Sequence, residues 1–358
     1  MTTKPRAKRA TSYDVARLAS VSQTTVSLIV NEAPTANISQ ETRARVHAAI
    51  AQLDYHPHEA ARSLRRRSTH DIGVVIPDAT NPHYVDIIAG IEAHAGANGY
   101  STFVSATGFD TSSERRSLQW LKQQRIDALI LCSLIGTDWY EDARQLLEQG
   151  YTITTLGIPF PVSDTGPVST DTELGERLTL EHLAALGHRR IGYIYGVFDQ
   201  QIYGARLQRC LAVQRELGLP VIEDWVRRCG PTRHEGYHAM ESLLAACAGA
   251  ERPTALVVVN DHLALGVLAA LHRAGIAVPT AMSVSSFDNT NLAPYTIPSL
   301  TSVDVEARAM GERAARLTIE RLSDPQQRLA LVQVEPRLVV RDSTGPAPSA
   351  SGRDMSDL

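Results

Sequence analysis

Apolar residues follow two different patterns along the chain, and the change falls near residue 70. Between Thr11 and Tyr55 they recur three or four positions apart, as they do on the buried face of amphipathic helices. From Asp71 onward, short apolar runs alternate with helical patterns, several of which end at a glycine. The sequence therefore predicts a small all-α head followed by a larger α/β region.

Residues 11–31 contain two short helical patterns joined by a tight turn. Thr11 and Asp14 have the spacing of a capping box, and Ser22 is a suitable N-cap for the second helix. Six apolar positions are expected to face inward: Val15, Leu18 and Ala19 in the first helix, and Val26, Ile29 and Val30 in the second. This pattern is typical of a helix-turn-helix, whose second helix reads the DNA major groove. An ordinary helical hairpin has the same pattern.

A third helix is predicted over residues 39–55, so that three helices form the head. Residues 59–67 then form a helix-capable linker in which Leu64 is the single large apolar residue among arginines. One leucine cannot build a core, so Leu64 packs against a twin in another subunit or wedges into another molecule. A solvated tether is the alternative.

The region after residue 70 predicts two similar lobes with parallel sheets covered by helices on both faces, separated by a Pro/Gly-rich break at 159–167. Ligands bind at the carboxyl ends of such strands, and two facing lobes make a cleft there. Strands are expected at 72–76, 101–105, 128–132, 152–156, 191–195, 255–259, 283–287, 329–334 and 338–340. Helices are expected at 84–98, 112–124, 139–149, 173–186, 203–217, 234–247, 262–274 and 305–322. Residues 343–358, rich in Pro, Ser and Gly, predict a disordered tail.

Charge is distributed unevenly between these regions. Residues 1–70 contain 11 Lys and Arg against 5 Asp and Glu, whereas the rest contains 24 against 34. A basic head on an acidic body predicts that only the head meets a polyanion such as DNA. The four cysteines show no C-x-x-C spacing, and no secretory signal or membrane-spanning run is apparent, so we expect a reduced protein in the cytoplasm, associated with the nucleoid.

One short motif favours an enzyme instead. Residues 234–238, HEGYH, fit the H-E-x-x-H signature of zinc proteases. Gly236 weakens the helix that this signature needs, and no H-x-x-G-x-x-H extension follows. A zinc metallopeptidase is therefore the alternative hypothesis, with a plain solute-binding protein as the next. We expect no enzyme activity, no catalytic or metal-binding residue and no cofactor.

Several separated stretches together resemble the lactose-repressor (LacI/GalR) family of bacterial transcription regulators. The resemblance runs from about Tyr13 to Asp342 and is carried by YDVARLASVSQTTVSLIVN, AARSL, IGVVIPDATNPHY, HLAALGHRRIGYI, ARL at 205–207, PTALVVVNDHLALG and VSSFDNTNLAPYTIPSLTSV. It implies a ligand-responsive repressor that binds operator DNA as a homodimer, with an activator as the alternative that the sequence does not separate. It also implies a core like the periplasmic sugar-binding proteins. The expected parts are a DNA-binding head (1–56), a hinge helix (57–70), a two-lobed core (71–342) and a tail (343–358). Lobe 1 would comprise about 71–164 and 305–325, and lobe 2 about 165–304 and 326–342.

The resemblance implies DNA contacts from the head and the hinge. Gln23 and Thr24 occupy the principal base-reading positions, and Leu28 stands where the lactose repressor has an arginine, so a bidentate contact to guanine is not expected there. Leu64 matches the hinge leucine that wedges into the central minor groove. A two-fold axis implies a palindromic operator, and no leucine heptad follows residue 342, which favours a dimer. The expected DNA-binding residues are Tyr13, Ser22, Gln23, Thr24, Thr25, Ser27, Leu28, Asn31, Arg62, Ser63 and Leu64.

The resemblance also implies an effector site between the lobes. Arg206, Asn260 and Asp288 match positions that usually contact the small molecule, and Asp78 and Tyr84 would face them from the other lobe. A carboxylate accepts from two neighbouring hydroxyls, an arginine donates in fixed geometry and an amide does both. The alternatives are a helix cap for Asp78, a salt bridge for Arg206 and packing for Tyr84.

Two departures from the family pattern bear on the effector. Residues 229–231, Cys-Gly-Pro, replace the stretch in which many relatives have an aromatic that stacks on the ligand. Residues 200–202, Gln-Gln-Ile, lack the Arg and Thr of the purine repressor. This favours a sugar or a related polyol over a purine.

Overall fold

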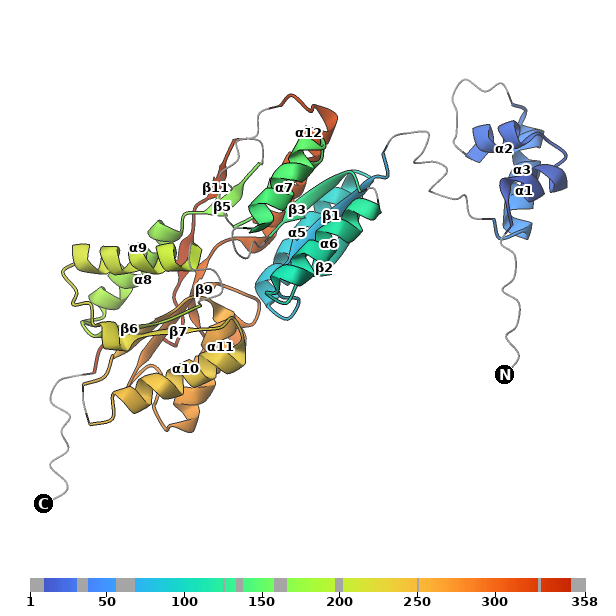
Figure 1. Ribbon diagram of the computed structural model, residues 1–358. Helices are drawn as coiled ribbons and strands as arrows, with labels where there is room; N and C mark the ends of the chain where they lie inside the picture. The colour runs from blue at the N-terminus through green and yellow to red at the C-terminus, as the bar shows by residue number, and fades with distance from the viewer. Residues whose placement is uncertain are drawn as a thin grey trace, which may run out of the picture. The chain divides into compact units, whose positions relative to one another are not determined.

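The computed structural model describes residues 10–30, 38–55, 68–124, 126–132, 138–157, 166–196, 202–249, 251–327 and 330–348. The chain divides into two compact units, residues 1–69 and 70–358 (Figure 1). The first is helical and the second is an α/β core with parallel sheets, so the predicted fold class is confirmed. None of the helices in the described ranges combines the length and apolarity needed to cross a bilayer.

The head contains three helices whose N-termini are capped as the sequence predicts. Thr11 and Asp14 form the complete capping box of α1. The Ser22 hydroxyl accepts from the Thr25 amide at 3.0 Å, and Ser39 accepts from Thr42 at 3.2 Å. Each cap satisfies an amide that the helix itself leaves unpaired. The helices are α1 (Ser12–Leu18), α2 (Gln23–Val30) and α3 (Gln40–Gln52).

One predicted core position of the head is wrong. Leu18 is 45% exposed, whereas Ala16 is buried beside Val15 and Ala19. Successive residues in a helix are rotated by about 100°, so the buried face centres between Val15 and Ala16 and leaves Leu18 about 100° away. The buried residues of the head are Val15, Ala16, Ala19, Val26, Ile29, Val46 and Ala49.

The first lobe of the core is built on a parallel sheet in the order β2-β1-β3-β4. Alternate residues of β1 face opposite layers of helices, because side chains in a strand point alternately to the two faces. Val74 packs in the cluster that contains α5 and α12 residues, and Val75 packs with α6 and α7. The strands are β1 (Asp71–Ile76), β2 (Ser101–Ala106), β3 (Ala128–Leu131) and β4 (Thr152–Thr155). The helices are α5 (Pro82–Ala97), α6 (Thr111–Gln123), α7 (Asp138–Glu148) and α12 (Ala307–Ser323).

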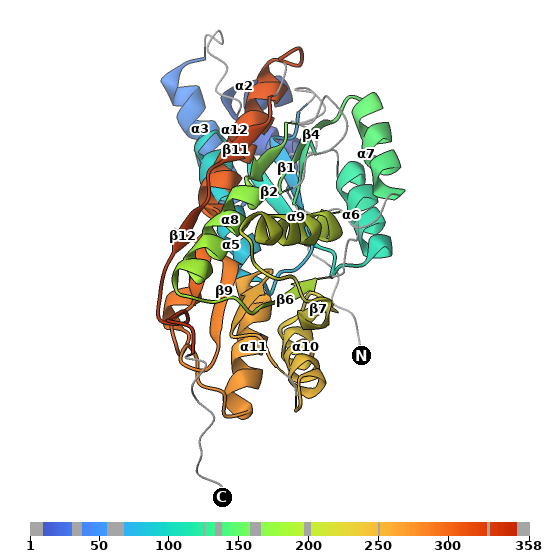
Figure 2. The same cartoon turned by 90° about the vertical axis from the view of Figure 1, so that its left-hand side faces the viewer.

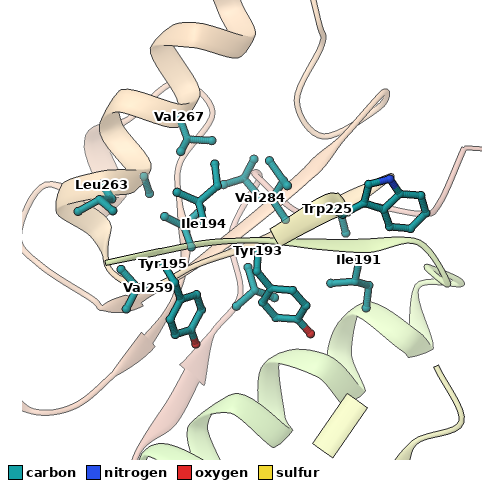
Figure 3. Packing of buried hydrophobic residues seen from close by; sticks show 14 of the residues in the cluster. Ile191, Tyr193, Ile194, Tyr195, Trp225, Val259, Leu263, Val267 and Val284 are labelled. Carbon is teal, nitrogen blue, oxygen red and sulfur yellow. The ribbon is translucent and has the colours of Figure 1, made fainter. Parts of the chain in front are cut away.

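The second lobe has a six-stranded sheet in the order β12-β10-β9-β8-β6-β7, in which only β12 runs antiparallel. Figure 3 shows Tyr193 and Tyr195 on one side of β6 and Ile194, with Val267 of α11, on the other. The strands are β6 (Ile191–Gly196), β7 (Val226–Cys229), β8 (Ala255–Val258), β9 (Ser283–Asp288), β10 (Thr301–Asp304) and β12 (Arg337–Val339). The helices are α8 (Thr172–Ala185), α9 (Ile202–Glu216), α10 (Arg233–Ala246) and α11 (Asp261–Arg273), with 3-10 turns η1 (Glu223–Trp225) and η2 (Ala293–Tyr295). Figure 2 shows α8 and α9 on one side of β6 and α10 and α11 on the other.

Two short strands lie close to the predicted boundaries between the lobes. β5 (Val168–Thr170) and β11 (Val332–Val334) pair in parallel, and Val168 bridges to Leu156 directly after β4. Val168 and Val334 are buried in a hydrophobic cluster that contains α5 and α12 residues and also Phe287 and Val303 of the second-lobe sheet. The pair forms a two-stranded sheet of its own, which the isolated bridge from Val168 joins to the end of β4. The predicted boundaries, which assign residues from 165 and from 326 to lobe 2, stay a prediction.

The predicted disordered tail is wrong for residues 343–348. Ser343 is fully buried, and its carbonyl accepts from the Val284 amide at 2.8 Å. The Gly345 carbonyl lies 3.0 Å from Nε2 of the buried His188, and the Ala347 amide donates to the Leu186 carbonyl. These bonds fasten the segment to the second lobe. Residues 349–358 lie outside the described residues.

Candidate functional site

The start of α2 presents a polar surface on the head. Gln23 and Thr24 are exposed directly after the Ser22 cap, and Leu28, one turn further on, is 37% exposed. Val26 and Ile29 are buried on the other face of the helix. Thr25 and Ser27 are half-buried, and the Thr25 hydroxyl lies 2.9 Å from that of Ser22. Tyr13 is also exposed, and the remaining expected DNA contacts, Asn31, Arg62, Ser63 and Leu64, lie outside the described residues.

The core brings together loops that follow the carboxyl ends of strands from both lobes. Asp78 follows β1 and Tyr84 lies in the first turn of α5, both in lobe 1. Asn260 follows β8 and caps α11, and Asp288 is the last residue of β9, both in lobe 2. Arg206 lies on α9 of lobe 2. The sheet ends where open α/β proteins bind ligands therefore carry four of the five expected effector residues.

Two acid–imidazole pairs join the lobes in a reciprocal arrangement. His262 Nε2 lies 3.7 Å from Oδ2 of Asp78, and His83 Nδ1 lies 3.5 Å from Oδ1 of Asp288. Each lobe thus supplies one carboxylate and one imidazole. Within the described residues, the buried Nδ1 of His262 has no hydrogen-bond partner, and the contact from Nδ1 of His83 to Asp288 does not have the geometry of a hydrogen bond. A buried polar atom without a partner needs an explanation in a native structure, and a water, an ion or a ligand can supply the missing partner.

Sequence reasoning missed both histidines, although each lies in a stretch that carries the family resemblance. His83 is in NPHY and His262 in NDHLALG. Burial lowers the pKa of His262, and the charge of Arg233 adds to this, whereas Asp78 and Asp288 oppose it. His262 is consequently neutral at pH 7 and offers the site a donor or an acceptor rather than a charge.

The turn that contains Asp288 is fastened by the buried carboxylate of Asp261. Asp288 has a φ of 98°, an unusual conformation for a residue other than glycine. Asp261 lies beneath this turn and accepts from the Thr290 amide at 2.7 Å and from the hydroxyls of Ser286, Thr290 and Ser302. Burial raises the pKa of Asp261 to about 6, and the charge of Asp288 contributes to the rise. Asp261 was not among the expected site residues.

Arg206 makes the salt bridge that was the alternative hypothesis for it. Its Nε lies 3.0 Å from Oε1 of Glu176, which is 1% exposed. The guanidinium carbon stands 3.9 Å from the centre of the Phe287 ring, directly before Asp288 in the sequence. Arg206 is therefore fixed beside the carboxyl end of β9 by a bond on one edge and a ring on one face.

The other three expected effector residues also have structural partners. Asp78 Oδ1 accepts from the amide and hydroxyl of Thr80 at 2.7 and 2.8 Å. Asn260 Oδ1 accepts from the Leu263 amide at 2.9 Å as the cap of α11. Tyr84 is 9% exposed and packs in the first-lobe core. Its packing was the alternative to a ligand contact.

Comparison with known proteins identifies the family. Residues 11–58 match the model of bacterial regulatory proteins of the lacI family, and residues 180–344 match a periplasmic binding protein-like domain. The HTH-type transcriptional repressor PurR of Mannheimia succiniciproducens is 33% identical over 342 residues, which cover 93% of this chain and 98% of that protein. The chain belongs to the lacI family. It is a ligand-responsive, DNA-binding transcriptional regulator.

Solved lacI-family structures have the same architecture. The lac repressor dimer bound to operator and the anti-inducer ONPF aligns with a TM-score of 0.81 at 28% identity, covering 94% of this chain and all of that one. The complex of the regulator CelR with cellobiose aligns with a TM-score of 0.69 at 27% identity and the same coverage.

In this lacI-family regulator the HEGYH segment forms the first turns of α10. Glu235, the general base of the protease signature, is bonded to the amide and hydroxyl of Thr232 in a capping box. His234 and His238 are exposed, with their Nε2 atoms 3.1 Å apart. Across the part of the chain that the structure describes, no group of three or more His, Cys, Asp or Glu residues is arranged to hold a metal ion. The motif therefore serves as a helix start here.

Proposed function

We propose that the protein is a homodimeric repressor that binds a palindromic operator, with its DNA affinity set by a sugar or a related polyol between the two lobes. The observation that carries this proposal is the reciprocal pairing of Asp78 with His262 and of Asp288 with His83. Carboxylates accept hydrogen bonds from hydroxyl groups, and imidazoles donate or accept. Hydroxyl-rich molecules therefore suit this set of groups.

The solved relatives support the same class of ligand. CelR was solved with cellobiose, and a lacI-family regulator from Enterococcus faecium was solved with ribose, at 25% identity and a TM-score of 0.68 over 77% of this chain. Among the five expected effector residues, Asp78, Arg206 and Asp288 would contact the ligand directly. Asn260 would contribute through its side-chain NH2 group, because its Oδ1 already caps α11. Tyr84 would form part of the wall of the effector site.

On the head, Gln23 and Thr24 would read base edges, and Leu28 would contact a thymine methyl group. Tyr13, Ser22, Thr25, Ser27, Asn31, Arg62 and Ser63 would complete the contacts. Leu64 would pair with its twin in the partner subunit and wedge into the minor groove, which bends DNA. The protein would act in the cytoplasm, where the operator lies, as a regulator and without peptidase activity.

The two sites would communicate through the arrangement of the lobes. A ligand that binds between Asp78 and Asp288 would change how the two lobes close. This would shift the first lobes of the two subunits against each other and favour either an ordered or a disordered hinge helix. This is a coupling free energy between two sites acting through one two-state element. Its sign decides whether the ligand releases or strengthens DNA binding.

The test begins with a thermal-shift screen of sugars and polyols on the full chain, followed by operator binding with and without the hit. Asp288→Asn keeps the side chain's size at a position with positive φ. We expect this variant to bind the hit at least about tenfold more weakly, because a hydrogen bond to a charged group contributes about 1.5–3 kcal/mol. Asp224→Ala, at an exposed position in η1, is the control. If Asp288→Asn bound the hit as tightly as the parent, the site assignment would be wrong.

A further inference from the structure

A buried glutamate lies behind Arg206 and is bonded on both of its oxygens. Glu176 Oε1 accepts from Nε of Arg206 at 3.0 Å and from the Tyr195 hydroxyl. Its Oε2 accepts from Sγ of Cys210 at 3.1 Å. The side chain of Glu176 is 1% exposed and that of Arg206 is 15% exposed. The glutamate is thus part of the interior, and the arginine reaches from it towards the surface.

The surroundings of Glu176 are built from three elements. Glu176 lies on α8, Tyr195 on β6, and Arg206 and Cys210 on α9. Figure 3 shows the Tyr195 hydroxyl pointing away from the aliphatic side chains of Ile194 and Val267. Burial raises the pKa of both Tyr195 and Cys210 well above the ordinary values, and the charge of Glu176 adds to the rise. Both groups therefore stay protonated and donate to Glu176.

Gly175, the residue before Glu176, positions the Phe287 ring that stacks on the guanidinium group of Arg206. A Cβ atom on Gly175 would lie 2.8 Å from the Phe287 ring, so this ring packs directly against the α8 backbone. Phe287 in turn lies 3.9 Å from the guanidinium carbon of Arg206. Two adjacent residues of α8 thus set the position of Arg206. Glu176 binds its guanidinium group, and Gly175 leaves room for the Phe287 ring that stacks on it.

The balance of charges at the expected effector site follows from this pairing. Glu176 cancels the charge of Arg206, whereas the imidazole that faces Asp78 is kept neutral by burial and by Arg233. Asp261 and Asp288 add further negative charge at the end of β9. Two cations lie near this end of the site within the described residues: the exposed Arg233, whose charge acts on His262, and Arg341, whose Nη2 donates to Oδ1 of Asn289 at 2.6 Å. The three carboxylates Asp78, Asp261 and Asp288 outnumber them. A site with this balance repels a phosphate or carboxylate group on its ligand.

We propose that Glu176 determines specificity, because by neutralising Arg206 it makes the site select uncharged polyhydroxylated ligands over their phosphorylated or carboxylated counterparts. This inference rests on the proposed sugar or polyol function of the same site. In this arrangement Arg206 acts as a directed hydrogen-bond donor whose positive charge is balanced by Glu176. Glu176 is a positioning and charge-setting residue and does not itself touch the ligand.

The experiment compares Glu176→Gln with the parent on matched ligands. The probes are glucose with glucose 6-phosphate and glucuronate, and ribose with ribose 5-phosphate, measured by isothermal titration calorimetry on the full chain. The parent should bind an uncharged member at least about tenfold more tightly than its anionic counterpart. Glu176→Gln leaves one uncompensated positive charge and should shift that ratio towards the anion by about tenfold or more. Glu173→Gln, an exposed position on the same helix, should leave the ratio unchanged.

The outcomes separate this inference from the function on which it rests. An unchanged ratio in a folded Glu176→Gln protein overturns the role of Glu176 and leaves the sugar site standing. A parent that binds the anionic member as tightly as the uncharged one, or more tightly, overturns the inference without any variant, which covers a Glu176→Gln protein that does not fold. A parent that binds operator DNA but no sugar or polyol in the wider screen refutes the proposed effector class as well.

Discussion

Helices α5 and α12 cross so closely at two glycines that adding one methyl group at either glycine should push the helices apart. A Cβ on Gly90 would lie 2.0 Å from the Arg308 carbonyl oxygen, and one on Gly311 would lie 2.1 Å from that of Ile87. Both clashing atoms belong to the backbone, so no side-chain rotation relieves the overlap. Ordinary contact begins at 3.4 Å. In Gly90→Ala the two helices must therefore move apart by about 1.4 Å, the difference between these two distances, at the crossing.

The expected cost follows from two opposing terms. Overpacking a tight core costs about 1–3 kcal/mol, and a backbone clash of this depth belongs at the upper end. Alanine gains about 1 kcal/mol over glycine in a helix interior. The variant should therefore lose about 2 kcal/mol of unfolding free energy, which in a core of this size lowers the Tm by about 3 °C. Its effector affinity should also fall, because α5 begins with the turn that carries His83.

The same helix offers a matched control. A Cβ on Gly96 meets no atom within 4 Å, and this glycine is exposed near the end of α5. Gly96→Ala should therefore leave stability unchanged or raise it by up to about 1 kcal/mol. Thermal and urea unfolding of the three proteins decide the matter. A Gly90→Ala protein as stable as Gly96→Ala would show that the crossing accepts a methyl group and that the steric reasoning is wrong.

Two further predictions concern the core and the head. Asp261 has a pKa of about 6 in the folded state against about 3.9 in unfolded chains, so between these values the folded protein binds more protons. Asp261 therefore contributes up to about 3 kcal/mol to the free energy of unfolding below pH 4, and this contribution is lost as the pH rises to about 6. Asp261→Asn should remove this slope and leave a constant offset, measured as unfolding free energy at pH 4.5 and 7; a parallel pH profile in both proteins would contradict it. Leu28→Arg should shift operator preference towards guanine at the contacted step without abolishing binding, as read by selection from a randomised operator library. Identical base preferences would refute that role for Leu28.

The fold could be predicted where local periodicity decides it, and was missed where short polar segments find distant partners. The strands β5, β7 and β10 are three or four residues long, and VRRC and TSVD contain too few apolar residues to stand out. Ser343 and Gly345 look like tail residues by composition. They are ordered because Val284 and His188, far away in the sequence, supply their hydrogen-bond partners.

The site was predictable in position and less so in detail. Family motifs placed Asp78 and Asp288 at strand ends, and the fold puts them there. Motifs say nothing of the distance between residues in different lobes, which is why the two histidines were missed. Glu176 gave no local signal at all, because its partners come from β6 and α9.

Under the proposed function, the lobe-to-lobe pairs would give a small neutral molecule a means of controlling this regulator. At 3.5 and 3.7 Å the imidazole nitrogens and carboxylate oxygens are farther apart than in a good hydrogen bond, so the pairs hold the lobes only weakly. A ligand hydroxyl that donates to Asp288 and accepts from a histidine replaces one long contact by two short ones. Allosteric coupling typically amounts to about 1–3 kcal/mol, the worth of a few hydrogen bonds. If the ligand binds as proposed, exchanging these two pairs for ligand contacts would suffice to bias the arrangement of the lobes without any charge on the ligand.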